Sequence, residues 1–164
     1  MGRKSVKENK NLYINTRESL DLSRLDVNME TGISVDRLGR IESGQAKAYQ
    51  DEILLLSKLY KCPALTNYYC SHDCPIGREY VPAIDKKELS QIVLEILAAL
   101  NSVNNDKERL IEITADGKIT KDEFDDFNKI RVQLASISKS VESLRIWVDE
   151  MIANNKIDDS IKDN

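Results

Sequence analysis

Hydrophobic residues recur at helical spacing along most of the chain. Between residues 11 and 69 they return at three- and four-residue steps in short stretches. This pattern predicts five short helices, over residues 11–20, 24–31, 35–42, 50–60 and 64–69. Ser23 and Ser34 stand directly before the second and third helices, where a serine side chain caps a helix N-terminus. Gly32 supplies the left-handed turn that ends the second helix, and the two helices that flank this turn have the spacing of a helix-turn-helix.

The C-terminal half shows a longer amphipathic pattern. It predicts one helix over residues 86–114, and after Asp116-Gly117 a capping box of Thr120 and Glu123 precedes a last helix that ends near Asn154. The last helix carries an apolar stripe close to heptad spacing, which includes Leu134, Ile137, Val141, Leu144 and Val148. Two such helices bury too little apolar surface alone, so we expect them to form a hairpin that dimerises through this stripe.

The predicted fold class is therefore all-α. A five-helix helix-turn-helix domain is expected at residues 11–69, and a long C-terminal helical hairpin at residues 86–154. Residues 70–85 hold two of the three prolines together with Gly77, which predicts an irregular connector. Residues 1–10 and 155–164 lack an apolar period and are expected to be a flexible arm and tail.

Charge is distributed unevenly along the chain. The net charge is −4, but residues 1–61 hold 11 Lys/Arg against 9 Asp/Glu, and residues 62–164 hold 13 against 19. The N-terminal arm carries four basic residues, namely Arg3, Lys4, Lys7 and Lys10. Such an arm either contacts phosphates or is a solvated tail. There is neither a run of 18 apolar residues nor a signal peptide, and the cysteine count is odd, so we expect no membrane partner and a cytoplasmic location.

The segment from Leu12 to Leu65 resembles the Cro/xenobiotic-response-element (XRE) type of helix-turn-helix domain, the fold of many phage and bacterial repressors. The residues that carry the resemblance are Gly32-Ile33-Ser34, Leu38 and Arg40-Ile41-Glu42-Ser43-Gly44, preceded by Arg17-Glu18 and Leu22-Ser23. It covers about a third of the chain. The remainder is similar to the C-terminal halves of uncharacterised regulators from anaerobic Firmicutes, which implies no mechanism.

The resemblance implies that the first turns of the third helix read double-stranded DNA, through Ser34, Val35, Asp36, Arg37 and Arg40. The side-chain chemistry agrees, because arginine pairs with guanine, aspartate accepts from cytosine N4 and valine contacts the thymine methyl group. Arg24 and Lys47 are expected at phosphates. For each of these residues the alternative is a solvated surface side chain.

Two further positions matter to the helix packing. In related domains an arginine of the first helix pairs with the glutamate that follows the recognition helix, which implies a structural ion pair between Arg17 and Glu42. Family members usually have alanine where Asn28 stands. The asparagine either widens the helix crossing or hydrogen-bonds nearby backbone, and with the acidic Asp36 it raises the chance of weakened or narrowed DNA binding.

Two clusters invite a metal-binding interpretation. Cys62, Cys70, His72 and Cys74 lie within 13 residues and have the donor types of a tetrahedral zinc site, but no Cys-x-x-Cys pair is present. Buried or free thiols, or a redox-sensing thiol, are the alternatives, and no cofactor is predicted. The segment from Glu112 to Glu123 has the glycine and final glutamate of a calcium-binding loop, but a capped turn between helices explains the same residues with fewer assumptions.

No enzyme site is predicted. His72 is the sole histidine, and no catalytic triad or phosphate-binding loop is apparent. We therefore expect a sequence-specific transcriptional regulator that binds a near-palindromic operator as a homodimer. The alternative is a protein-interaction module, such as an antirepressor or an antitoxin-like partner of a regulatory protein, built on the same scaffold.

Overall fold

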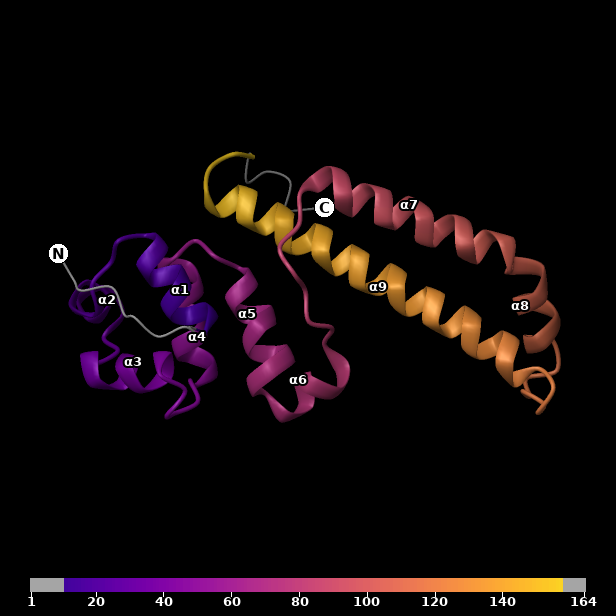
Figure 1. Cartoon of the computed structure of the whole chain (residues 1–164), viewed down its shortest axis with the longest axis horizontal. Coiled ribbons are helices and arrows are strands. Elements are labelled where there is room, and N and C mark those ends of the chain that lie inside the picture. The colour runs from indigo at the N-terminus through magenta and orange to yellow at the C-terminus, as the bar shows by residue number, and fades with distance from the viewer. Residues whose placement is uncertain (1–10, 158–164) are drawn as a thin grey trace. The chain divides into compact units, whose positions relative to one another are not determined.

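The computed structural model describes residues 11–157, and these fold into helices with no β-strand among them (Figure 1). The all-α prediction is therefore confirmed for this range. The chain divides into two compact units, the first with residues 11–84 and 148–157 and the second with residues 85–147. None of the helices within residues 11–157 combines the length and apolar character needed to cross a membrane.

The first unit begins with short helices close to the expected positions. They are α1 (Leu12–Ser19), α2 (Arg24–Thr31), α3 (Val35–Glu42), α4 (Gln50–Leu59) and α5 (Ala64–Tyr68). Each end lies within one residue of the predicted end. The bounds follow from local chemistry, because the Ser23 and Ser34 hydroxyls accept backbone N–H groups at the starts of α2 and α3. Gly32 ends α2 with a φ of 75°, a conformation that favours glycine.

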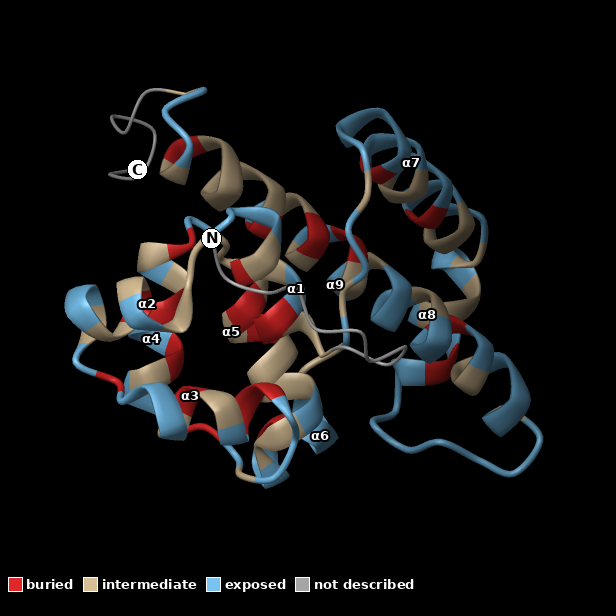
Figure 2. Ribbon diagram, turned by 60° about the vertical axis from the view of Figure 1, so that its left-hand side comes forward, coloured by how far each residue is buried: buried red, intermediate tan, exposed pale blue. Residues whose placement is uncertain are grey.

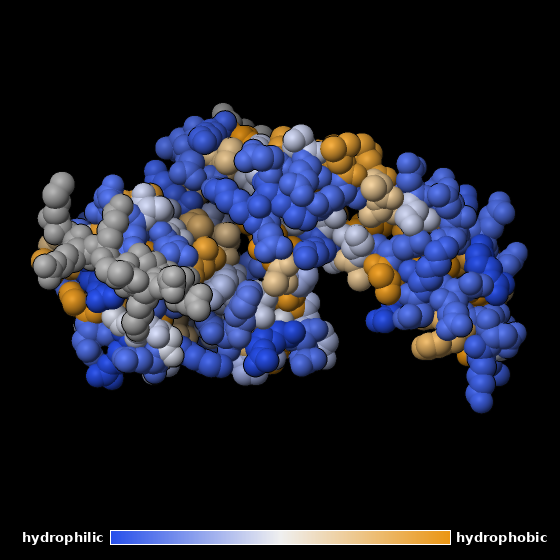
Figure 3. Space-filling model, in the orientation of Figure 1, coloured by the Kyte–Doolittle hydropathy of each residue, from blue (hydrophilic) through white to orange (hydrophobic). Residues whose placement is uncertain are grey.

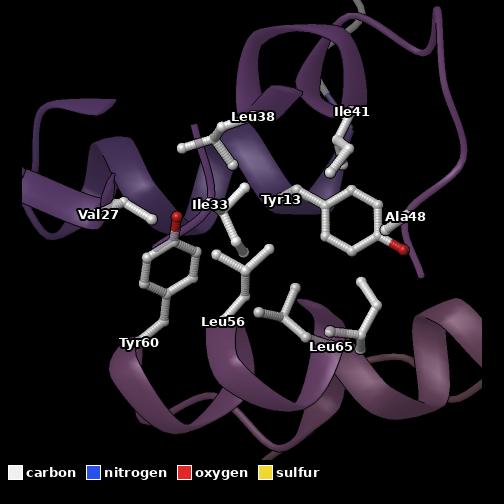
Figure 4. Close-up of a cluster of buried hydrophobic side chains, with 10 residues drawn as sticks. Tyr13, Val27, Ile33, Leu38, Ile41, Ala48, Leu56, Tyr60 and Leu65 are labelled. Atoms are coloured by element: carbon white, nitrogen blue, oxygen red, sulfur yellow. The ribbon is translucent and has the colours of Figure 1, made fainter. Parts of the chain in front are cut away.

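A single apolar cluster holds these helices together. Leu38 of α3, Leu56 of α4 and Leu65 of α5 are fully buried, and Val27 of α2 joins them. Figure 4 shows Leu38 and Ile41 of α3 reaching into the same interior as Leu56 and Leu65. Figure 2 marks the same division, with buried residues on the inner faces of the helices and exposed residues on the outer ones. One face of α3 is therefore fixed in the core, which leaves its opposite face free.

The predicted irregular connector over residues 70–85 is wrong for its first part. A π-helix covers Tyr69–Asp73 and α6 covers Pro75–Tyr80. Pro75 starts a helix here because proline is tolerated in the first turn, and the Cys74 sulfur accepts the backbone N–H of Gly77. Gly77 is buried against Cys70, and a Cβ atom on Gly77 would lie 2.1 Å from the Cys70 carbonyl oxygen.

The second unit contains α7 (Leu89–Asn105), α8 (Lys107–Thr114) and α9 (Phe124–Ala153) up to Trp147. The predicted single helix over residues 86–114 is therefore wrong, because it begins later and is divided at Asp106. The Asp106 carboxylate accepts hydrogen bonds from Lys129 and Gln133 of α9, at 3.1 and 2.8 Å. α9 runs back beside α7 and α8 (Figures 1 and 2).

The stripe expected to join two copies of the chain is only partly exposed. Leu134 and Val141 are 46% and 53% exposed, whereas Ile137 and Leu144 are half-buried. Val148 is half-buried and belongs to the first unit. α7 adds exposed apolar side chains, namely Leu89, Val93, Leu97 and Leu100. Figure 3 shows apolar surface over α7.

Candidate nucleic-acid interface

The turn between α2 and α3 is fixed by side-chain hydrogen bonds. Ser23 and Asp26 form a reciprocal capping box at the start of α2, and the Ser34 hydroxyl accepts the N–H of Arg37 at 3.2 Å. The Asn28 amide nitrogen donates to the carbonyl oxygen of Ile33 at 3.1 Å. Of the two alternatives for Asn28, the structure therefore has the backbone hydrogen bond. This bond ties α2 to the turn that precedes α3.

The C-terminal end of α3 is held by a buried carboxylate. The Glu42 side chain is fully buried and accepts hydrogen bonds from Nε and Nη2 of Arg17, at 2.5 and 2.9 Å. Arg17 also donates from Nη1 to the Leu22 carbonyl at 2.7 Å. Burial of the Arg17 guanidinium tends to lower its pKa, but the hydrogen bonds and charge of Glu42 outweigh this and raise the pKa. The structure thus brings together the two residues that were expected to pair.

Arg24, which was expected at a phosphate, joins the same carboxylate. Its Nε donates to Glu42 at 2.8 Å, while the side chain stays 39% exposed. The guanidinium crosses α3 at Gly39, where a Cβ atom would lie 3.5 Å from Arg24 Nη1. Gly39 was not expected to matter. Its position inside a predicted helix could have indicated a packing role, because glycine destabilises a helix interior by about 1 kcal/mol relative to alanine.

Arg37, expected to contact a base, makes contacts within the protein instead. Its guanidinium donates to both Glu52 oxygens at 2.8 Å and to the Lys47 carbonyl at 2.8 Å, and it lies 4.5 Å from the centre of the Tyr49 ring. These contacts join α3 to the start of α4. Arg37 therefore forms a structural ion pair in the described chain, and its contact with a base stays a prediction. The sequence separation between Arg37 and Glu52 gave no signal for this pairing.

Glu52 also caps α4. Its carboxylate accepts the backbone N–H of Tyr49 at 2.7 Å. Partial burial of this carboxylate tends to raise its pKa, but the hydrogen bonds from Arg37 and Tyr49 outweigh burial and lower the pKa. Glu52 is therefore ionised at neutral pH, and the position of Arg37 is fixed.

The outer face of α3 presents the other predicted reading residues. The side chains of Asp36 and Arg40 are 77% and 60% exposed, and Val35 is 42% exposed. Arg40 Nη2 lies 3.1 Å from the Asp36 carboxylate one helical turn away. An exposed pair of this type is weak, so the guanidinium can exchange its partner for an external acceptor at little cost.

Lys47 lies in the loop between α3 and α4. Its Nζ donates to the carbonyl oxygen of Asp73 at 3.2 Å, and the residue is exposed. The bond to a neutral carbonyl leaves the charge of the ammonium uncompensated, so Lys47 can also attract an anion.

The two clusters whose residue types invite a metal-binding interpretation have other contacts in the structure. Cys62, Cys70 and Cys74 are half-buried, and within residues 11–157 no group of three His, Cys, Asp or Glu side chains is placed to hold a metal ion. Burial, together with Cys74, raises the pKa of the Cys70 thiol. His72 stacks on Tyr68 with 4.4 Å between the ring centres.

In the segment that resembles a calcium-binding loop, Glu123 accepts hydrogen bonds from the N–H and hydroxyl of Thr120, at 2.9 and 2.6 Å. These bonds are those of a capped turn before α9.

No known family model matches the chain, and no curated protein and no solved structure is significantly similar to it.

Proposed function

We propose that this chain is a sequence-specific DNA-binding transcriptional regulator in which α2 and α3 act as a helix-turn-helix and α3 is the recognition helix. The observation that carries the proposal is the division of α3 into two faces. Leu38, Ile41 and Glu42 fix one face in the core, while Asp36 and Arg40 stand exposed on the other. An α-helix with one rigidly held face and exposed polar groups on the other suits the major groove.

The exposed side chains suit specific bases. Arg40 can donate two hydrogen bonds to guanine O6 and N7, and Asp36 can accept from cytosine N4. On free protein these two side chains satisfy each other at 3.1 Å. On DNA each would exchange its partner for a base edge, and Val35 would contact a thymine methyl group.

The groups around α3 suit the phosphate backbone. Arg24 keeps part of its guanidinium exposed while Glu42 fixes its direction, and Lys47 is exposed in the loop that follows α3. Ser34, at the N-terminus of α3, adds a hydroxyl near the positive end of the helix dipole. The basic arm of residues 1–10, expected to reach phosphates, lies outside the described residues.

We further propose that the regulator is a homodimer on a near-palindromic operator. A dimer places two recognition helices one turn of DNA apart, roughly 34 Å. The exposed apolar residues of α7 and α9 suit this role, in particular Val93 and Leu97 on α7 with Leu134 and Val141 on α9. They extend the expected stripe from one helix to two.

DNA binding is tested by fluorescence anisotropy with a labelled random-sequence duplex across a range of salt concentrations. We expect affinity to fall with salt, with a slope of about −0.9 for each phosphate contacted. On a duplex that carries a sequence selected by the chain, Arg40→Ala should weaken binding, and Arg78→Ala, which removes an exposed arginine of α6, should preserve it. Equal affinities for these two variants would contradict a role for α3.

The alternative is a protein-interaction module, such as an antirepressor or an antitoxin-like protein. The extensive exposed apolar surface of α7, with Leu94 67% exposed, favours it. An affinity for DNA that stays absent at low salt, in a folded protein, would favour this alternative over the regulator.

A further inference from the structure

A groove lies between α7 and α9 within the second unit. Its volume is about 480 Å³, which falls in the range of small-molecule sites. The groove exists because the facing positions carry small side chains, among them Ala98 and Ala99 on α7 and Ser136 and Ser140 on α9. Leucine or isoleucine at these positions would fill the space, as in an ordinary helical hairpin.

The hydroxyl groups that line this groove lack partners. Ser102, Ser136 and Ser140 make no side-chain hydrogen bond with other described residues. By contrast, Ser143 on the same helix donates to the Lys139 carbonyl at 2.9 Å, which is the usual arrangement for a serine inside a helix. Three hydroxyls of the groove lining thus remain available as donors and acceptors.

Gln133 adds an unsatisfied acceptor to the same lining. Its amide nitrogen donates to Asp106 at 2.8 Å, and its Oε1 is buried with no hydrogen-bond partner. A buried carbonyl oxygen without a donor costs free energy. A ligand O–H or N–H that reached it after a small side-chain rotation would recover that cost.

The charges in the groove do not cancel. Lys87 Nζ bonds to both oxygens of Glu95, at 2.8 and 2.7 Å, so these two side chains neutralise each other. Lys139 lines the groove and makes no ion pair or side-chain hydrogen bond with another described residue, although its charge helps to lower the pKa of Glu95. Two lysines therefore face a single carboxylate in this groove. One positive charge is left over in a half-enclosed site, where an anion is attracted more strongly than at an open surface.

We propose that this groove binds a small hydroxylated anion, a hydroxycarboxylate or a sugar phosphate. Lys139 pairs with the anionic group, while the hydroxyls of Ser102, Ser136 and Ser140 bond with those of the ligand. Ala98, Ala99 and Val132 supply the apolar wall against which the carbon skeleton lies. The site is a further one and does not depend on DNA binding by α3.

The test is a titration of the ¹⁵N-labelled full chain followed by NMR, with gluconate and glucose 6-phosphate as the probes. Glucose is the control that carries hydroxyls without charge. Inorganic phosphate and acetate are the controls that carry charge without a hydroxylated carbon skeleton. We expect at least one of the two hydroxylated anions to shift resonances of groove residues on both α7 and α9, and to bind more tightly than all three controls. Preference for gluconate or for glucose 6-phosphate identifies the anionic group. If neither binds, or if glucose binds as tightly, the proposal is overturned.

Three substitutions test whether the ligand binds in this groove. Lys139→Gln should weaken it by about tenfold or more, the usual effect of losing a hydrogen bond to a charged group. Lys121→Gln removes the same charge from an exposed position outside the groove and should leave affinity unchanged. Ala98→Leu fills the groove from an exposed position and should abolish binding even if Lys139→Gln disturbs folding. Equal affinities for Ala98→Leu and the unaltered chain would place the ligand elsewhere.

Discussion

The buried carboxylate of Glu42 binds two guanidinium groups. Its carboxylate accepts from Arg17 and Arg24, and the Arg17 side chain is itself nearly buried. A charge enclosed in this way is stabilised only while its partner is present. The contact therefore couples α1 and α2 to the end of α3.

We predict that Glu42→Gln lowers the free energy of unfolding by about 3–5 kcal/mol, because it removes the carboxylate that accepts two Arg17 hydrogen bonds and leaves the buried guanidinium only the weaker ionic contact with Glu18 at 3.9 Å. Urea unfolding followed by circular dichroism measures the change. Glu79→Gln, at an exposed position of α6, is the matched control and should shift stability by no more than about 0.5 kcal/mol. Equal effects of the two substitutions would show that the buried pair contributes little.

The Arg37–Glu52 pair predicts a pH dependence. The pKa of Glu52 is lowered from 4.5 in the folded state, so its contribution is complete above that value and is lost as pH falls through the lowered pKa. Glu52→Gln should therefore reduce stability by about 1 kcal/mol at neutral pH, and the difference should disappear under acidic conditions. Unfolding curves of both proteins across this pH range measure it. A difference that persists in acid would contradict the ionic origin of the contact.

At the scale of elements, local chemistry determines which helices are predictable. The five short helices could be predicted from the helical spacing of their apolar residues, and the ends of α2 and α3 from Ser23, Gly32 and Ser34, which lie at those ends. The break between α7 and α8 could not, because Asp106 bonds to Lys129 and Gln133, which lie more than twenty residues away.

In the candidate site, too, features set by the local sequence could be predicted and features set by distant contacts could not. The exposure of Asp36 and Arg40 follows from the helical period of α3. The ion pair between Arg37 and Glu52, by contrast, depends on how α4 packs against α3, and no local sequence pattern encodes that contact.

The packing of α6 against the preceding π-helix gives a prediction at this scale. Gly77→Ala would place a methyl group against the Cys70 backbone and should lower the free energy of unfolding by about 2 kcal/mol or more. Thermal unfolding measures it. Gly39→Ala has room for the methyl group within α3 and should be neutral or stabilising by up to about 1 kcal/mol. A Gly77→Ala protein as stable as Gly39→Ala would contradict the close packing.

At the scale of the whole molecule, the exposed apolar residues of α7 and α9 predict self-association. Light scattering should give a mass about twice the 18.7 kDa of one chain. Leu134→Asp combined with Val141→Asp should reduce it to that of a monomer, because a charge is costly in an apolar interface. Ile111→Asp, a similar change at an exposed position of α8 off the stripe, should leave the dimer intact. A monomeric unaltered chain at micromolar concentration would contradict the dimer.

The measurement that tests the central claim most directly is selection from a random DNA library by the purified full chain, with Arg40→Ala and Arg78→Ala in parallel. We predict enrichment of a short motif in two inverted copies, whose centres lie about 10 base pairs apart. The enrichment should be lost with Arg40→Ala and kept with Arg78→Ala. No enriched motif from a folded protein, or the same motif from Arg40→Ala, would contradict the proposal that α3 reads DNA.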